Sequence, residues 1–291
     1  MSELYDVIVI GGGAAGLSGA LTLSRARRRV LVLDGGRPRN APADGVHNYL
    51  GREGTPPREL VRIGRDEVGG YGGQVVAGTV TRAVRDGEEF QVETEAAAYR
   101  ARRLLVASGA ADELPGIPGV AEGFGHWVLH CPYCHGWEVQ DRRIGVIASG
   151  GMAAHQALLW TQWSDDVVLF GNGRSVDGVP EKVHVVEGPV ERVEAAGVHL
   201  RNGAFVARDA LVVQTRVLAR AGFLETLGLA TTDLVMQDEV VATYVKGDAT
   251  GRTDVPGVWV AGNVADPMAQ VIVAAGAGMK AGAAINMDLL Q

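Results

Sequence analysis

The sequence of 291 residues predicts an α/β protein with two three-layer domains, the second inserted into the first. Residues 6–34 and residues 143–173 both show a strand, a glycine-rich turn, a helix and another strand. A Pro/Gly-rich hinge separates the two segments, and a further core strand near Gly262 returns the chain to the first domain. Each of these segments is typical of a Rossmann-like nucleotide-binding domain. The expected limits are residues 1–114 with 216–291 for the first domain and 115–215 for the inserted domain, which carries the CxxC.

The first domain begins with an apolar strand at 6–10 and the turn Gly11-Gly-Gly-Ala-Ala-Gly16. An apolar helix is expected over residues 17–27. The next strand, 30–33, ends at Asp34, which completes a βαβ unit.

Residues 35–55 are rich in Gly, Pro and Asn and predict a long loop. Thr55-Pro-Pro-Arg-Glu-Leu60 has the signature of a helix start, with a capping Thr followed by prolines and an acid. Alternating apolar residues at 74–83 and 89–94 indicate an antiparallel meander, and 104–107 returns as a core strand.

The hinge, Leu114-Pro-Gly-Ile-Pro-Gly119, opens the inserted domain. There the pattern predicts a strand at 144–148, a turn at 149–154, a helix at 155–163 and a strand at 167–170. The remaining expected elements are strands at 183–187, 211–213 and 257–262 and a C-terminal helix at about 269–290.

Composition excludes several classes of protein. A net charge of −7 argues against a nucleic-acid binder, which needs a basic face. No apolar run reaches the roughly 18 residues of a membrane span, and the N-terminus lacks the pattern of a secretory signal. The only two cysteines form one CxxC, which fits a reducing compartment, so we expect a cytoplasmic protein.

The first glycine turn has the full context of a dinucleotide site. Gly11-x-Gly13-x-x-Gly16 lies between a strand and a helix, and Asp34 ends the next strand. Glycines let the backbone approach a pyrophosphate, the helix start supplies N–H donors, and the acid can accept from a ribose hydroxyl. A purely structural turn is the alternative, and the motif does not choose between FAD and NAD.

Cys131-Pro-Tyr-Cys134 can open and close as a disulfide within one turn of backbone, and Pro132 suits the first turn of a helix. Two other interpretations are an inert pair and a zinc site with His130 and His135. Four donors within six residues rarely surround one tetrahedral ion, so no metal is expected.

These motifs together resemble the low-molecular-weight thioredoxin reductase family over essentially the whole chain. The resemblance rests on the first glycine turn, Leu105-Val-Ala-Ser-Gly109, the CxxC, and Gly257-Val-Trp-Val-Ala-Gly-Asn-Val264 with Gln270. It implies bound FAD and a homodimer. Asn263 stands where the family usually has Asp, and Asn48 matches the family's flavin-side Asn. The residues implied to contact FAD are Gly11, Gly13, Ala14, Ala15, Gly16, Asp34, Asn48, Gly109, Gly262, Asn263 and Gln270.

The resemblance also implies roles for the cysteine pair. Cys134 would lie nearer the flavin, and Cys131 would exchange with substrate. Family members carry an acid–base Asp directly after the second cysteine, where this chain has His135. An imidazole there can accept a proton near neutral pH, so His135 is the expected base.

The second glycine turn is degraded. Ala148 stands at the first glycine position, and the following strand ends in Phe170-Gly-Asn-Gly173, without an acid for a ribose. Arg174 is the single nearby base, a poor substitute for paired arginines on a 2′-phosphate. Trp160 and Trp163 are expected to pack in the core. NADPH is therefore a doubtful cofactor, although weak binding through backbone donors stays open.

Without NADPH, electrons must enter from a thiol. The expected function is an FAD-dependent thiol–disulfide oxidoreductase that oxidises a small dithiol, with O2 as acceptor. The run from Cys131 to Glu138 is similar to the family's branch of holomycin and gliotoxin dithiol oxidases. An NADPH-dependent reductase of thioredoxin or a similar protein is the alternative, and a flavin-loaded redox sensor is a third hypothesis.

Overall fold

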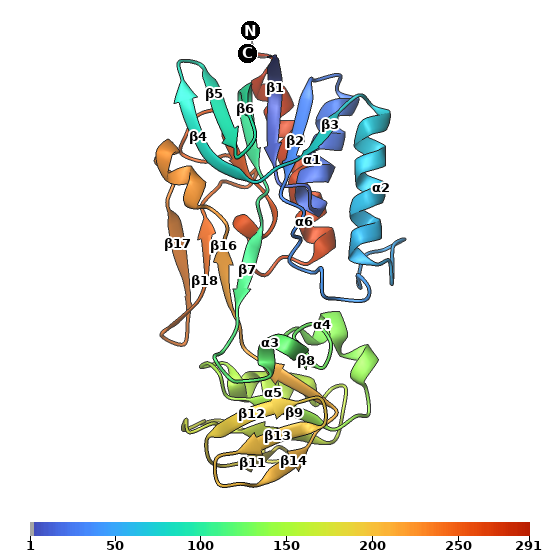
Figure 1. Ribbon diagram of the computed structural model, residues 1–291, viewed down its shortest axis with the longest axis vertical. Helices are drawn as coiled ribbons and strands as arrows, with labels where there is room; N and C mark the ends of the chain where they lie inside the picture. Colours follow the sequence, from blue (N-terminus) through green and yellow to red (C-terminus); the bar gives the residue numbers. More distant parts are fainter. Residues whose placement is uncertain (1–2) are drawn as a thin grey trace.

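The computed structural model describes residues 3–291 as two lobes joined by two chain segments (Figure 1). The first lobe is built on a seven-stranded sheet of order β3-β2-β1-β6-β5-β4, with β19 also paired to β6. Its strands are β1 (Leu4–Ile10), β2 (Val30–Asp34), β3 (Gln74–Ala77), β4 (Val80–Asp86), β5 (Glu89–Thr94), β6 (Ala98–Val106) and β19 (Val258–Val260).

The centre of this sheet is parallel and buried on both faces, as continuous apolar runs predict. β1 pairs in parallel with β2 and β6, and β19 pairs in parallel with the carboxyl-terminal part of β6. The expected meander is partly wrong. β4 and β5 form an antiparallel hairpin, but β3 pairs in parallel with β2. Apolar alternation does not reveal pairing direction, which explains the error.

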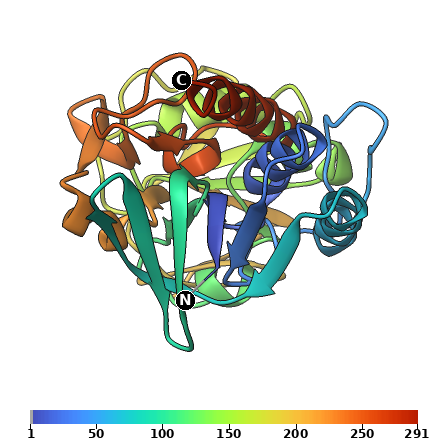
Figure 2. The same ribbon diagram turned by 90° about the horizontal axis from the view of Figure 1, so that it is seen from above.

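Helices α1 (Ala14–Arg25), α2 (Pro57–Gly70) and α6 (Val271–Asp288) belong to the same lobe. Figure 2 shows the dark-red α6 lying along the blue α1. Glycines permit this approach, because a Cβ on Gly278 would lie 1.9 Å from the Ala15 carbonyl oxygen and one on Gly282 would lie 2.7 Å from that of Gly19. The α1 helix begins earlier than expected, inside the glycine turn itself.

The second lobe is built on a parallel sheet of order β11-β10-β9-β15-β8 and the antiparallel sheet β12-β13-β14. Its strands are β8 (Val128–Leu129), β9 (Ile144–Ile147), β10 (Val167–Phe170), β11 (His184–Val186), β12 (Val190–Glu194), β13 (Gly197–Leu200), β14 (Phe205–Ala207) and β15 (Ala210–Val213). Its helices are α3 (Val120–Gly123), α4 (Pro132–His135) and α5 (Ala153–Trp160). Residues 171–183 connect β10 to β11 through turns, without a crossover helix.

The two segments that join the lobes lie side by side. They are β7 (Ala110–Glu113) and β16 (Arg216–Ala219), which pair antiparallel, so that Arg216 lies opposite Glu113. With β17 (Thr231–Met236) and β18 (Glu239–Val245) they form a four-stranded sheet that the sequence patterns did not predict.

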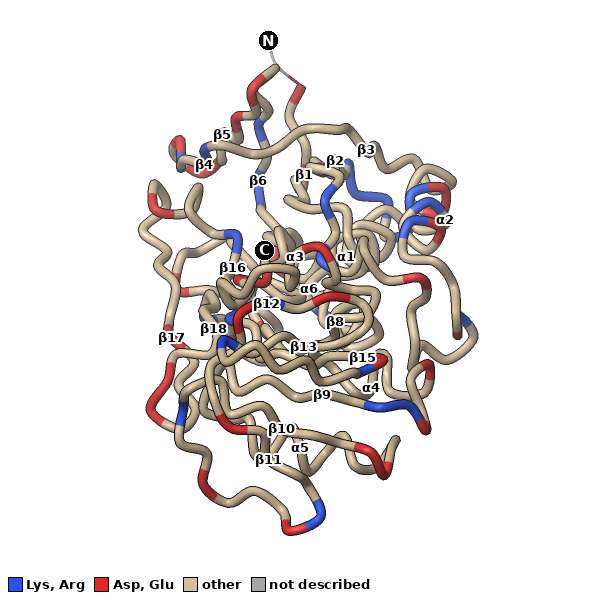
Figure 3. Tube along the Cα trace, turned by 60° about the horizontal axis from the view of Figure 1, so that its bottom comes forward, with Lys and Arg blue, Asp and Glu red and all other residues tan. Residues whose placement is uncertain are grey.

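Opposite charges are interspersed along the surface elements. Figure 3 shows acidic and basic positions together on α2, where Arg62 pairs with Glu59 and Asp66. No helix among residues 3–291 is long and apolar enough to cross a membrane.

Candidate active site

A cavity of about 1650 Å³ is lined by residues of both lobes and of the segments joining them. Most of the residues singled out in the sequence line it. They are Gly11, Gly13, Ala14, Ala15, Asp34, Gly109, Cys131, Cys134, His135, Gly262, Asn263 and Gln270. Gly16 and Asn48 do not line this cavity.

The three glycines of the first turn have different structural roles. Gly11 has φ +108°, and a Cβ there would lie 2.2 Å from the Ala107 carbonyl oxygen. A Cβ on Gly16 would lie 1.8 Å from the Gly11 carbonyl oxygen. A Cβ on Gly13 would have no protein atom within 4 Å and would enter the cavity. Gly11 and Gly16 therefore close the turn, whereas Gly13 leaves open space, which fits a pyrophosphate lying against the turn.

Asp34 lies at the end of β2, where a ribose hydroxyl is expected. One carboxylate oxygen accepts from the Gly36 N–H at 3.1 Å, and the other pairs with Arg65 of α2. The sequence pattern did not predict Arg65 as a partner. This pair holds the carboxylate at the edge of the cavity.

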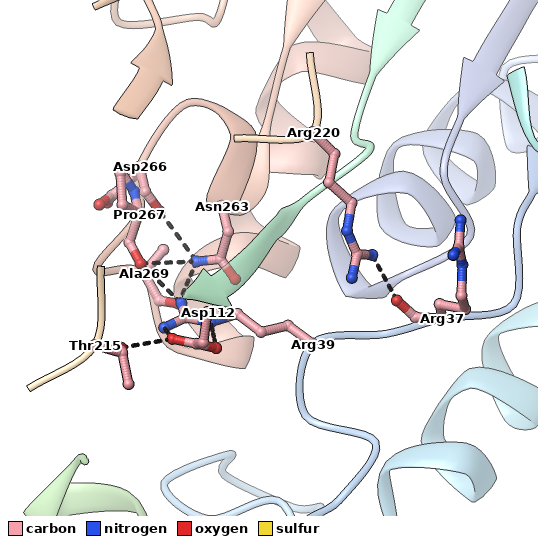
Figure 4. Close-up of polar contacts among 9 residues, drawn as sticks. All are labelled: Arg37, Arg39, Asp112, Thr215, Arg220, Asn263, Asp266, Pro267 and Ala269. Atoms are coloured by element: carbon pink, nitrogen blue, oxygen red, sulfur yellow. Dashed lines mark hydrogen bonds and ion pairs between the residues drawn. The ribbon is translucent and has the colours of Figure 1, made fainter. Parts of the chain in front are cut away.

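Asn263 organises the loop before α6. Its Nδ2 donates to the carbonyl oxygens of Asp266 at 3.0 Å and Ala269 at 2.9 Å (Figure 4). A carboxylate cannot donate these bonds, so the replacement of the family's Asp by Asn has a local structural reason. Gln270 follows as the N-cap residue of α6.

Cys131 and Cys134 are joined as a disulfide with their Cα atoms 5.3 Å apart. Cys131 is the N-cap residue of the one-turn helix α4, which begins at Pro132. The Trp163 indole packs directly on Gly136, the residue after α4. A Cβ on Gly136 would lie only 2.7 Å from this indole, so a glycine is needed there. Trp160 is fully buried, as expected, but Trp163 is only half-buried and supports the disulfide segment.

Two histidines flank the disulfide. Burial lowers the pKa of His135 below its usual value, although Glu138 opposes the shift. Burial also lowers the pKa of His130 to about 4. Both imidazoles are therefore neutral at pH 7, and the larger shift makes His130 a weak base.

Asn48 connects the loop after β2 to the disulfide segment. It adopts φ +59°, and its Nδ2 donates to the Tyr133 carbonyl oxygen at 2.7 Å. Glu53 holds the loop by accepting from the Asn48 N–H at 2.9 Å. A smaller pocket of about 280 Å³ beside this contact is lined by Asn48, Tyr133 and Cys134 but not by Cys131.

An ion pair that sequence reasoning missed lies where the lobes join. Arg39 donates two bonds of 2.7 Å to the Asp112 carboxylate, and Thr215 donates another of 2.8 Å (Figure 4). Arg39 also donates to the Pro267 carbonyl oxygen at 3.0 Å. Burial alone would raise the pKa of Asp112, but the bonds from Arg39 outweigh it and lower that pKa. No local pattern predicts this cluster, because its members lie 73 and 103 residues apart.

A second arginine contact lies nearby. Arg220 donates to the Arg37 carbonyl oxygen at 2.6 Å, and both side chains line the cavity. Burial and the neighbouring charge of Arg37 lower the pKa of Arg220. Arginine nevertheless stays protonated at neutral pH, so the guanidinium groups of Arg37 and Arg220 make this wall of the cavity cationic (Figure 4). A cationic wall suits an anionic ligand.

Comparison with known proteins identifies the family. A family model described as pyridine nucleotide-disulphide oxidoreductase matches residues 5–278. The chain belongs to this family. It is 30% identical to the protein named thioredoxin reductase tcpT of Claviceps purpurea (strain 20.1), covering 92% of this chain and 94% of the relative. It is also 30% identical to the thioredoxin reductase of Treponema pallidum (strain Nichols) over the full length of both.

Solved structures agree with this oxidoreductase family. The crystal structure of HlmI superposes with a TM-score of 0.90 at 44% identity, covering 98% of this chain and 92% of that one. An oxidoreductase from Agrobacterium tumefaciens gives a TM-score of 0.92 at 35% identity, covering 99% of both chains. The resemblance to thioredoxin reductase-like flavoproteins and the predicted fold class, with two Rossmann-like domains, are confirmed. Family membership implies FAD, and the open space at Gly13 fits it.

Proposed function

We propose that this oxidoreductase oxidises a small-molecule dithiol to a disulfide, with bound FAD as the electron carrier and O2 as the final acceptor. The observation that carries the proposal is the shared cavity of about 1650 Å³. It is lined both by the glycine turn that suits a pyrophosphate and by the Cys131–Cys134 disulfide. A dithiol that reaches the disulfide is thus next to the space that suits FAD.

The thiol step balances as an exchange. A substrate thiolate attacks one sulfur of the Cys131–Cys134 bond, which breaks as a mixed disulfide forms. The second substrate thiolate then displaces that enzyme sulfur, leaving an oxidised substrate and two enzyme thiols. FAD supplies the two-electron acceptor for these thiols, and O2 takes up the two electrons and two protons as hydrogen peroxide. Following the resemblance, Cys131 exchanges with substrate and Cys134 faces the flavin.

His135 is the proposed base. It follows Cys134 directly in α4 and lines the same cavity. Since burial keeps its imidazole neutral at pH 7, it can take the proton from a cysteine or substrate thiol. A neutral base supports thiolate formation without adding a fixed charge.

The alternative is an NADPH-dependent reductase of thioredoxin or a similar protein. The names of two relatives, both thioredoxin reductases, favour it. Against it stand the missing crossover helix between β10 and β11 and the ion pair that already occupies Arg174. The two activities differ in the electron donor that reduces the enzyme.

An anaerobic titration of the FAD-loaded protein tests the direction of electron flow. We expect dithiothreitol to bleach the flavin absorbance and NADPH at micromolar concentration to leave it unchanged. In air, dithiothreitol oxidation should then produce one hydrogen peroxide per disulfide, measured with a peroxidase assay. Rapid bleaching by NADPH would show that the reductase alternative is correct.

A homodimer, a cytoplasmic location and the domain limits at residues 114/115 and 215/216 are part of the same proposal. The exposed face of α6 supports the dimer, since Ile272, Val273 and Met279 lie on it with exposed fractions of 39%, 53% and 51%. Burying such a face against a second copy is favourable. Light scattering should give twice the monomer mass, and Val273→Glu should lower it.

A further inference from the structure

The second glycine turn is occupied by side chains of the protein itself. It lies between β9 and α5, where a dinucleotide pyrophosphate would need backbone N–H donors. The Gly151 N–H instead donates to Glu239 Oε2 at 2.7 Å, and the Met152 N–H donates to Gln214 Oε1 at 3.1 Å. A Cβ on Gly150 would lie 2.4 Å from the Gln214 side chain, so the space in front of that glycine is filled.

The Glu239 carboxylate also forms an ion pair with the cationic side chain next to the turn. Glu239 Oε1 pairs with Arg174, the single base near the end of β10. The Gly151 N–H and the Arg174 guanidinium lower the pKa of Glu239, so the side chain is ionised at neutral pH. Glu239 lies on β18, outside the second lobe, and therefore reaches the turn from the other side of the lobe junction.

We propose that Glu239 is a specificity-determining residue that takes the place of a dinucleotide phosphate at the second glycine turn and thereby excludes NADPH. The inference rests on the proposed function, because it explains why electrons enter from a thiol. The Glu239 carboxylate occupies the Gly151 N–H, which would donate to the pyrophosphate, and the Arg174 guanidinium, which would pair with the 2′-phosphate. The Gln214 side chain accepts from the other backbone donor of the turn, the Met152 N–H.

Exclusion follows from two physical effects. An incoming phosphate must displace a tethered anion, whose effective concentration at the turn is on the order of millimolar or more. If the carboxylate stays, it repels the phosphate across a few ångströms, and its pair with Arg174 takes up the cation that would otherwise compensate. A dinucleotide therefore competes against a ligand that the chain supplies.

Binding of 2′,5′-ADP tests the inference without involving the flavin, because this probe carries the phosphates but lacks nicotinamide. Isothermal calorimetry on the FAD-loaded protein should give weak binding to the wild type. Glu239→Ala should tighten it by about tenfold or more, the effect of removing one charged competitor. Glu239→Gln keeps the shape of the side chain but loses its charge, so its affinity for 2′,5′-ADP should lie between those of the wild type and Glu239→Ala. This variant still tests the inference if the alanine variant folds poorly.

Asp233→Ala is the matched control. Asp233 is an exposed acid on β17, the partner strand of β18 in the same hairpin, so its loss changes the net charge equally. We expect no change in affinity. The inference is overturned if Glu239→Ala and Glu239→Gln bind no tighter than Asp233→Ala, or if the wild type already binds at micromolar concentration. The additional change Arg174→Ala should abolish the gain of Glu239→Ala, since it removes the cation that was released.

The two proposals fail in different ways. If the dithiol neither bleaches the flavin nor yields peroxide, the proposed oxidase activity is wrong, whatever the affinity for 2′,5′-ADP. If the dithiol activity holds but the Glu239 variants do not gain affinity, only the role of Glu239 is wrong.

Discussion

At the scale of single residues, the first glycine turn separates a requirement of the fold from a requirement of the ligand. Gly11 and Gly16 have protein atoms where a Cβ would be, and Gly13 has none. The glycine motif in the sequence does not distinguish these roles. The tertiary structure distinguishes them, because only the Cβ position of Gly13 faces the open space of the cavity.

Gly13→Val should therefore lose FAD while the apoprotein stays folded. The added side chain occupies the space against the turn without meeting protein atoms. We expect less than about a tenth of the wild-type flavin content, measured by absorbance, with an unchanged apoprotein melting temperature. Gly11→Ala should instead destabilise the apoprotein, because its Cβ meets the Ala107 backbone at a positive φ. A fully yellow Gly13→Val protein would contradict the placement of the site.

The two cysteines are distinguished by their serine variants. Because Cys134 is proposed to face the flavin, Cys134→Ser should keep FAD but lose the long-wavelength absorption of the reduced protein. Cys131→Ser should retain it, and both should lose peroxide production. A long-wavelength band that survives in Cys134→Ser but is lost in Cys131→Ser would mean that the two roles are reversed.

His130 should make stability depend on pH. Burial lowers its pKa to about 4, while an unfolded histidine titrates near pH 6.5. The unfolded state therefore binds the extra proton between these values, and the free energy of unfolding falls as pH falls from about 6.5 towards 4. Urea unfolding at pH 7 and 4.5 should show that His130→Gln loses about 2–3 kcal/mol less than the wild type. Equal losses would mean that His130 does not titrate in this range.

At the scale of elements, the contact between α1 and α6 positions the glycine turn, since α1 begins at Ala14 within it. The contact depends on glycines of α6 that face α1. Small residues were visible in the sequence of this helix, but which of them face α1 was not.

Gly278→Ala and Gly276→Ala test the contact as a matched pair. A Cβ on Gly278 would lie 1.9 Å from the Ala15 carbonyl oxygen, so the helices must separate, and we expect a loss of about 2–3 kcal/mol in the free energy of unfolding. Within one protomer a Cβ on Gly276 meets nothing within 4 Å, and Ala there should stabilise the helix by about 0.5–1 kcal/mol when both changes are compared in the Val273→Glu background, which removes the proposed dimer contact of this face. Chemical denaturation measures both, and effects of the same sign would contradict the packing described.

At the scale of the whole molecule, the relation of the two lobes depends on β7, β16 and the cluster around Asp112. Arg39 brings the loop after β2 and the loop before α6 to this junction. The cluster thus connects the cavity wall to the segments that carry the disulfide lobe.

Asp112→Asn should cost about 3 kcal/mol in the free energy of unfolding, because it leaves the Arg39 charge poorly paired where Asp112 is only 6% exposed. Glu113→Gln is the control on the next residue. Its pair with Arg216 is half exposed at 2.7 Å, so its loss should cost less than about 1 kcal/mol. Urea unfolding measures both variants, and equal costs would show that the buried pair does not hold the junction.

Much of the fold and several site residues could be predicted from the sequence. Apolar runs between turn residues located the parallel strands, and the glycine turn with Asp34 and the CxxC marked both halves of the cavity. These signals are local, since strand burial, turn conformation and a disulfide between residues three apart depend on near neighbours in the chain. Domain limits and the roles of individual site residues stay predictions.

Tertiary structure alone decided the remaining features. The parallel pairing of β3, the Arg39–Asp112–Thr215 cluster and the contact of Glu239 with the second glycine turn join residues far apart in sequence. Their energies depend on burial and on distances set by the packed lobes, which no short window of residues contains. The sequence by itself determined a flavoprotein-like α/β chain with a redox-active cysteine pair. Only the packing decided which side chains fill the second glycine turn. Gln214 and Glu239 lie far from that turn in the sequence, and they reach it only once the chain has folded.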